Sequence, residues 1–232
     1  MSLVLTIFWI LLISIFAVGG AYYAKRYNRS DALIALYVTL IVISNIIASK
    51  TIAFDFGFTT FFAPGAVLLF SVTFLLTDIV SEKFGRRETQ RMILLALFCQ
   101  IALIASSYLI VKAAPAPFFQ NQAAFEFIFG TVPRIVIASL ITFFVSENLD
   151  AYLFQWFKKL TGGKQLWMRN AFSSLPAMLV DSVLFVTLAF YGVMPTLPLI
   201  IGLTVVKWLV GVIDIPFMYL SRAVLGKSEE KV

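Results

Sequence analysis

Ionisable side chains lie within stretches of this chain that are otherwise almost wholly apolar. Glu147 and Asp150 are three residues apart, and Asp78 and Glu82 are four apart, so each pair shares one face of a helix. Charged groups in an apolar environment are costly, and they usually face a protein interior where they bind a ligand, move a proton or neutralise one another. The sequence therefore predicts binding chemistry at buried polar positions.

Five polar residues fall near the middle of five different apolar stretches. They are Asn45, Gln100, Glu147, Asp181 and Lys207. Helices that run in opposite directions bring these positions to similar depths, so we expect the five residues to form a substrate-binding site. A second interpretation stays open, in which Lys207 only neutralises Asp181 or Asp214 and lowers the cost of their burial.

The two acids near the end of the third apolar stretch have different expected roles. Glu82 lies near enough to the bilayer surface to pair with Arg86 or Arg87. Asp78 lies one turn deeper, and we expect it to accept hydrogen bonds from neighbouring helices and to order a gate.

Covalent catalysis lacks its usual groups in this sequence. The chain has no histidine and one cysteine, Cys99, which falls inside an apolar stretch. Ser–His and Cys–His nucleophiles and the commonest metal ligand are thereby excluded. We predict that the protein is not an enzyme, and we expect no metal site and no cofactor.

The composition is that of a membrane protein. Apolar residues make up 61% and charged residues 13% of the 232 residues, whereas soluble domains carry about 25% charged residues. A helix needs about 20 apolar residues to cross a bilayer, and seven stretches meet that length: 3–24, 31–53, 62–82, 89–113, 132–157, 170–192 and 197–221. We predict an all-α integral membrane protein, a single transmembrane domain (1–232) built as a bundle of about seven helices.

Lysines and arginines are distributed by membrane side. Most of the 18 lie after the first, third and fifth apolar stretches and in the C-terminal segment; Lys50, Lys112 and Arg134 lie on the other side, and Lys207 lies inside the last stretch. Positive charge is retained in the cytoplasm, so we expect the N-terminus outside and the C-terminus inside. The net charge of +6 thus indicates orientation in a membrane rather than nucleic-acid binding.

Three segments of this domain are distinguished. Residues 1–30 are predicted to form an extra N-terminal helix and a cytoplasmic loop, residues 31–221 a six-helix core, and residues 222–232 a cytoplasmic tail. The first stretch lacks a preceding basic segment and exceeds the roughly 7–15 apolar residues of a signal peptide, so we expect it to be retained. Residues 118–130 are too short and too mixed to span, and we interpret them as an interfacial or re-entrant segment.

An ordered series of motifs in residues 31–221 resembles the queuosine precursor transporter family, also called the vitamin uptake transporter family. The motifs are SNIIASKT (44–51), APG (63–65), FLLTDIVSEKFG (74–85), RIVIASL (134–140) with SENLDAYLF (146–154), and WMRNAFSSLPAMLVDSVLF (167–185). The resemblance implies polar family positions at Asn45, Asp78, Arg134, Ser139, Asp150, Arg169, Asn170, Ser174, Asp181 and Lys207. Of these, we expect Asp78, Arg134, Asp150, Arg169, Asn170 and Ser174 to gate the pathway or support the site.

The same resemblance implies a function and a fold. It indicates an inner-membrane importer of 7-deazaguanine precursors of queuosine, such as 7-cyano-7-deazaguanine. It also relates the six-helix core to the substrate-binding subunits of energy-coupling-factor vitamin transporters. A deazaguanine suits the predicted chemistry: its ring N–H and exocyclic amine match the carboxylate of Glu147 or Asp181, and its carbonyl matches a donor such as Asn45, Gln100 or Lys207.

Two modes of action follow from these features. The first is a stand-alone importer that works by alternating access, with facilitated diffusion and proton coupling both open as energy sources. The alternative is a vitamin- or purine-binding subunit that needs a separate energy-coupling ATPase module. For that alternative, the small residues Ala17 and Ala21 of the first helix are the candidate docking face.

Overall fold

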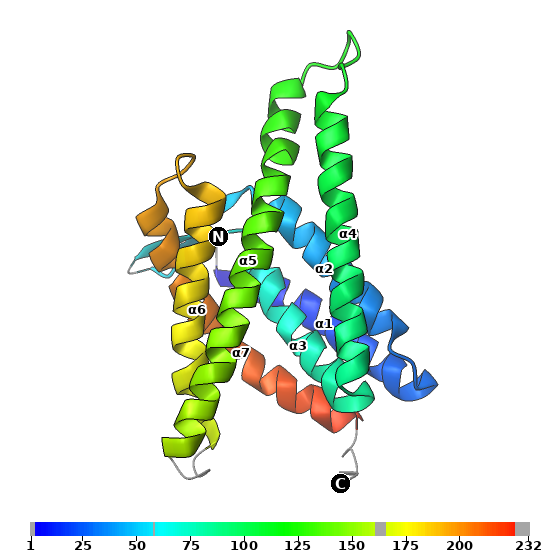
Figure 1. The fold of residues 1–232 in the computed structure, drawn as a ribbon, viewed down its shortest axis with the longest axis vertical. Coiled ribbons are helices and arrows are strands. Elements are labelled where there is room, and N and C mark those ends of the chain that lie inside the picture. Colours follow the sequence, from blue (N-terminus) through cyan, green and yellow to red (C-terminus); the bar gives the residue numbers. More distant parts are fainter. Residues whose placement is uncertain (1–2, 58, 161–165, 226–232) are drawn as a thin grey trace.

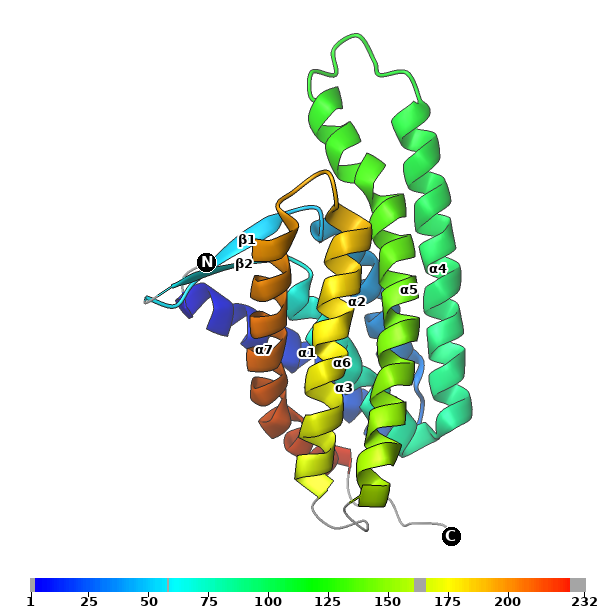
Figure 2. The ribbon, with the colours of Figure 1, turned by 60° about the vertical axis from the view of Figure 1, so that its left-hand side comes forward.

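The computed structural model describes residues 3–57, 59–160 and 166–225 and is mostly helical (Figure 1). The elements in chain order are α1 (Leu3–Tyr27), α2 (Asp31–Ile47), β1 (Thr51–Asp55), β2 (Thr60–Pro64), α3 (Val67–Phe84), α4 (Arg86–Lys112), α5 (Gln122–Leu160), α6 (Leu166–Phe190) and α7 (Thr196–Leu225). In Figure 2, α4, α5, α6 and α7 run side by side, and α1 and α3 cross behind them.

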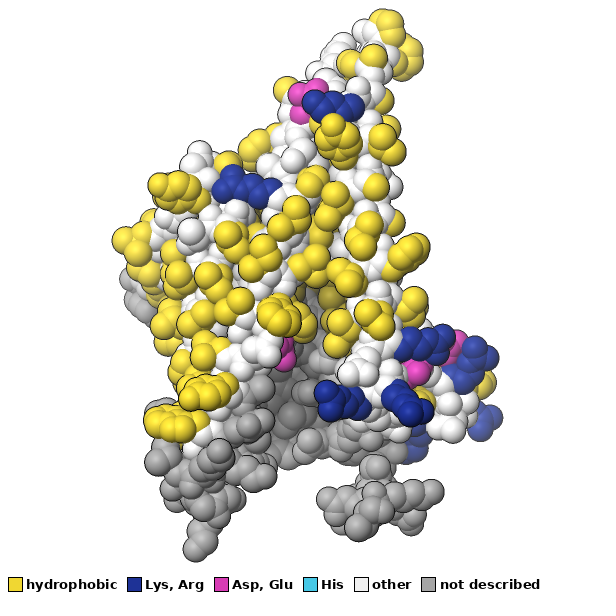
Figure 3. All heavy atoms as spheres, in the orientation of Figure 1, with side chains coloured by type: hydrophobic (Ala, Val, Ile, Leu, Met, Phe, Trp, Pro, Cys, Tyr) yellow, Lys and Arg dark blue, Asp and Glu magenta, His cyan; other side chains and the backbone are white. Residues whose placement is uncertain are grey.

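The described helices are suited to a lipid environment. Two of them, Arg86–Lys112 and Gln122–Asp150, are long and apolar enough to cross a bilayer, and Asp31–Ile47, Ser174–Phe190 and Thr196–Val210 are apolar but shorter. Large apolar side chains such as Phe98 and Phe144 are exposed on α4 and α5, where Figure 3 shows a face covered largely by apolar atoms. The fold is therefore that of a helical membrane protein, whereas seven crossings stay a prediction.

The basic residues at the end of α1 and at the start of α4 gather at one end of the molecule, which we call the basic end (Figure 3). A single residue, Gly85, separates α3 from α4; its φ of 82° reverses the chain there. The hydroxyl of Ser30 donates to Glu88 Oε1 at 2.6 Å and so joins the start of α2 to the first turn of α4. Because α2 and α4 both start at the basic end, they run in the same direction.

A β-hairpin occupies residues 51–64, so the all-α prediction is wrong for this segment, of which the sequence assigned 51–53 and 62–64 to helices. β1 and β2 pair in antiparallel register, with Ile52 opposite Ala63 and Phe54 opposite Phe61. Both strands are rich in threonine and aromatic or β-branched residues, which favour extended backbone. Hydropathy alone assigned residues 51–53 and 62–64 to the ends of two spans, because apolar strands and apolar helices score alike.

Residues 118–130, which were predicted to form an interfacial or re-entrant segment, do not form a separate segment. Helix α5 starts at Gln122 and continues through Pro133 to Leu160, so residues 122–130 are its first turns. Together with α4 they form an arm that projects beyond the other helices (Figure 1). A proline removes one backbone hydrogen bond from a helix, but Val132, Ile135 and Val136 on either side of Pro133 are buried and hold the helix in place.

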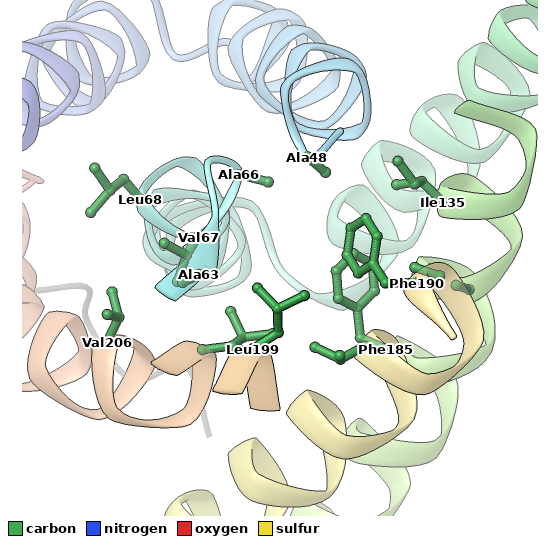
Figure 4. Close-up of a cluster of buried hydrophobic side chains, with 14 of the residues drawn as sticks. Ala48, Ala63, Ala66, Val67, Leu68, Ile135, Phe185, Phe190, Leu199 and Val206 are labelled. Atoms are coloured by element: carbon green, nitrogen blue, oxygen red, sulfur yellow. The ribbon is translucent and has the colours of Figure 1, made fainter. Parts of the chain in front are cut away.

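Two clusters of buried apolar side chains hold the helices together. One joins α1, α2, α3 and α4, and the other joins the hairpin to α3, α5, α6 and α7. Figure 4 shows the second, in which Phe185 and Phe190 of α6 lie near Leu199 of α7. Ala17 and Ala21 belong to the first cluster and have no exposed surface. They are covered by this chain's own helices, so the expectation that they form a docking face for a partner is wrong.

Candidate functional site

An ion pair between helices α6 and α7 is the centre of the candidate site. Lys207 Nζ donates to Asp181 Oδ2, and Ser146 of α5 donates to the other carboxylate oxygen at 3.1 Å. Three helices thus converge on one acid. The two charged side chains are only 17% and 21% exposed, and each stabilises the other in an apolar setting.

A cavity adjoins this ion pair. It is lined by Asp181 and Lys207, by Ser139, Thr142 and Phe143 of α5, by Phe70 of α3 and Phe185 of α6, and at one side by Pro64 and Ala66 beside the hairpin. One wall therefore offers charge and hydroxyl groups, and the others offer aromatic rings. Such a combination suits a flat ligand with polar edges.

The cavity is small in this conformation. Its volume is about 40 Å³, which is room for a few water molecules and well below the roughly 300–1,000 Å³ of small-molecule sites. A ligand with two fused rings could enter only after the surrounding helices move apart. The structure therefore represents a closed arrangement of this site.

Contacts between α5 and α6 support the site from both sides. Toward the hairpin end, Arg134 donates to the backbone carbonyls of Leu188 and Tyr191, both at 2.8 Å. Toward the basic end, Ser174 donates to Asp150 Oδ1 at 3.1 Å. The arginine supplies positive charge and a donor to the Leu188 carbonyl, one of the last of α6, which lack partners within the helix, and a second donor to the Tyr191 carbonyl just after the helix. These contacts fix the spacing of the two helices that carry Ser146 and Asp181.

Of the five residues predicted to bind substrate, the structure brings together Asp181 and Lys207 at the cavity. Asn45 and Gln100 are each 2% exposed and do not line it. Asn45 donates to the Ile41 carbonyl at 3.2 Å. Its Oδ1 atom and the whole amide of Gln100 have no hydrogen-bond partner among the described residues. Residues of α3 line the cavity, whereas the sequence predicted that Asn45 of α2 would line it.

Glu147 is also absent from the cavity wall. Its side chain is exposed, and it acts electrostatically on Tyr37 of α2. Ser146, the residue before it, faces Asp181 instead. The side chains of Asp78, Arg169 and Asn170 lie outside the described residues, so their predicted gating and supporting roles stay predictions.

The sequence did not predict a role for Ser146, Thr142 or the three phenylalanines that line the cavity (Phe70, Phe143 and Phe185). A serine or threonine in an apolar helix gives a weak signal, because its hydroxyl is commonly satisfied by a carbonyl of the same helix. Ser146 could have been found by its spacing, because it follows Ser139 and Thr142 at intervals of three and four residues and so shares their helix face. No comparable spacing distinguishes the three cavity phenylalanines from the others among the 24 in the chain.

Comparisons with known proteins connect the chain to membrane transport. The family model described as "Putative vitamin uptake transporter" matches residues 64–221, more than half of the chain. A Bacillus subtilis (strain 168) protein named "Probable queuosine precursor transporter" is 28% identical over 192 residues, which cover 81% of this chain and 82% of that protein. No solved structure matches the chain.

Proposed function

The chain belongs to the vitamin uptake transporter family, and on that premise we propose that it imports a flat purine-like compound, a 7-deazaguanine precursor of queuosine, across the inner membrane. The name of the Bacillus subtilis relative, a probable queuosine precursor transporter, supports this substrate class. The single observation that carries the proposal is the Asp181–Lys207 pair beside an aromatic-lined cavity.

The chemistry of a deazaguanine matches these groups. Its ring N–H and exocyclic amine are donors that a carboxylate such as Asp181 accepts, and its carbonyl oxygen accepts from an ammonium such as Lys207. Rings from Phe70, Phe143 and Phe185 line the same space and offer apolar surface to the flat faces of the ligand. A substrate between the two charged groups would replace part of the ion pair with its own hydrogen bonds.

Transport requires that the site open to each side in turn. In the closed arrangement, the ion pair keeps both charges neutralised while no substrate is bound, which lowers the cost of burying them. Binding of the substrate would separate Asp181 from Lys207 and loosen the contact between α6 and α7. The opening of these helices is the step that we assign to alternating access.

Reconstitution of the purified chain into liposomes tests this proposal. Labelled 7-cyano-7-deazaguanine should enter the vesicles, and unlabelled compound or guanine should compete, whereas riboflavin and biotin should not. Uptake without any ATPase supports a stand-alone importer; binding without uptake would favour the subunit interpretation. An imposed pH gradient that changes the rate would indicate proton coupling. Competition by a vitamin alone would contradict the proposed substrate.

A further inference from the structure

Thr142 of α5 has a buried hydroxyl group that no described residue satisfies with a hydrogen bond. The residue is 1% exposed, it lines the cavity beside Asp181 and Lys207, and its Oγ1 atom has no hydrogen-bond partner among the described residues. An unsatisfied buried hydroxyl is costly and therefore uncommon in folded proteins.

Two buried hydroxyl groups on the neighbouring helices α6 and α7 do have partners. Thr204 of α7 donates to the Ile200 carbonyl at 2.8 Å, and Ser182 of α6 donates to the Met178 carbonyl, also at 2.8 Å. Bonding to a carbonyl one turn back is the usual solution for serine and threonine inside a helix. Thr142 departs from it at the point where α5 faces the cavity.

The other buried polar atoms without partners do not single out a site in the same way. Unsatisfied atoms also occur on Trp9, Ser44, Asn45 and Gln100, but none of these residues lines the cavity. At the cavity itself, Asp181 and Lys207 bind each other, and Ser146 binds Asp181. Thr142 therefore supplies a donor and an acceptor that remain available to a ligand.

We propose that the Thr142 hydroxyl is a specificity-determining contact of the substrate site, which forms a hydrogen bond with one polar edge atom of the flat ligand. This inference rests on the proposed function for the identity of the ligand. The hydroxyl complements the ion pair: the charged groups bind one edge of the ring system, and Thr142 reads a further polar atom. Without a ligand, the Thr142 hydroxyl makes no hydrogen bond with a described residue and so adds nothing to the stability of the protein.

The variant Thr142→Val tests this inference, because valine has the shape of threonine without the hydroxyl. With purified protein, 7-cyano-7-deazaguanine should bind about 3- to 10-fold more weakly to Thr142→Val, as expected for one lost hydrogen bond. Thr142→Ser should stay within about 2-fold of the unaltered protein. Thr204→Val, which removes a hydroxyl bonded within its own helix, is the matched control and should not change affinity.

Analogues of the ligand identify the atom that is read. The analogue that lacks the group bound by Thr142 should lose affinity for the unaltered protein but lose no further affinity for Thr142→Val, because the two changes remove the same interaction. Equal affinity of the unaltered protein and Thr142→Val for every analogue would overturn the inference.

Thermal unfolding without ligand tests whether the Thr142 hydroxyl has a structural partner. The Tm of Thr142→Val should equal or exceed that of the unaltered protein, because replacing an unsatisfied hydroxyl with a methyl group is neutral or stabilising. A Tm lower by several degrees would show that the hydroxyl has a structural partner, which overturns the inference. If the unaltered protein binds no purine-like compound, the proposed function fails and the ligand contact with it, whereas a lowered Tm with normal purine binding overturns the role of Thr142 alone.

Discussion

Asp181 and Lys207 are opposite charges within an apolar bundle, and each is stable there because of the other. Asp181→Ala should abolish uptake and destabilise the protein, because Lys207 keeps its charge and loses its partner. We expect a loss of about 1–3 kcal/mol, below the ~3–5 kcal/mol typical of fully buried pairs, because the side chains are 17% and 21% exposed. Thermal unfolding and liposome uptake measure the two effects.

The double variant Asp181→Asn with Lys207→Met is the control for this prediction. It removes both charges, so its stability should return close to that of the unaltered protein. Uptake should stay low, since an amide accepts fewer hydrogen bonds from the substrate than a carboxylate and the ammonium donor is lost. Near-normal uptake by this variant would mean that Asp181 and Lys207 only neutralise each other and that Asp181 does not bind the substrate.

Arg134 joins two helices through two hydrogen bonds at the end of α6. Arg134→Met should lower stability by about 1–2 kcal/mol, because the carbonyls of Leu188 and Tyr191 lose their donors. Lys112→Met removes an exposed positive charge from the last turn of α4 and is the matched control. Equal unfolding temperatures for the two variants would show that the Arg134 contacts contribute nothing to stability.

At the scale of elements, the packing of α7 against β2 depends on one glycine. A Cβ atom at Gly202 would lie 1.9 Å from the Phe62 carbonyl oxygen and 2.6 Å from the Phe62 nitrogen. Both are backbone atoms of β2, which cannot rotate away as a side chain would. Gly202→Ala should therefore displace the hairpin and lower the unfolding temperature by several degrees.

Gly130→Ala provides the comparison for this prediction. A Cβ atom at Gly130 of α5 would meet nothing within 4 Å, and alanine favours a helix more than glycine by about 1 kcal/mol. This variant should be as stable as the unaltered protein or more so. An equal decrease in both variants would show that the close approach of α7 and β2 does not determine the effect.

At the scale of the whole molecule, the arrangement of charge predicts the orientation in the membrane. Many of the described lysines and arginines gather at the basic end (Figure 3), whereas Lys112 lies in the last turn of α4 and Arg134 lies toward the hairpin end of α5. Positive residues are retained in the cytoplasm, so a reporter fused after Val232 should report a cytoplasmic location, and a tag before Met1 an external one. A C-terminal reporter found outside would contradict the seven-span arrangement.

The sequence alone was sufficient for the properties that depend on composition and local pattern. Long apolar stretches predicted helices close to those in the structure: the stretch 197–221 corresponds to α7 (Thr196–Leu225) and 89–113 to α4 (Arg86–Lys112). The pairing of Asp181 with Lys207 was also foreseen as one interpretation, because a charge in an apolar span requires a partner at a similar depth.

Only the tertiary structure decided which faces of these helices meet. Hydropathy is a local sum that does not distinguish an apolar strand from an apolar helix, so the hairpin at 51–64 was missed. Depth along a helix does not fix the direction of a side chain, so Asn45 and Gln100 were placed at a cavity that they do not line. The importance of Thr142 depends on a hydrogen bond that its surroundings fail to supply, and no sequence pattern records the absence of a partner.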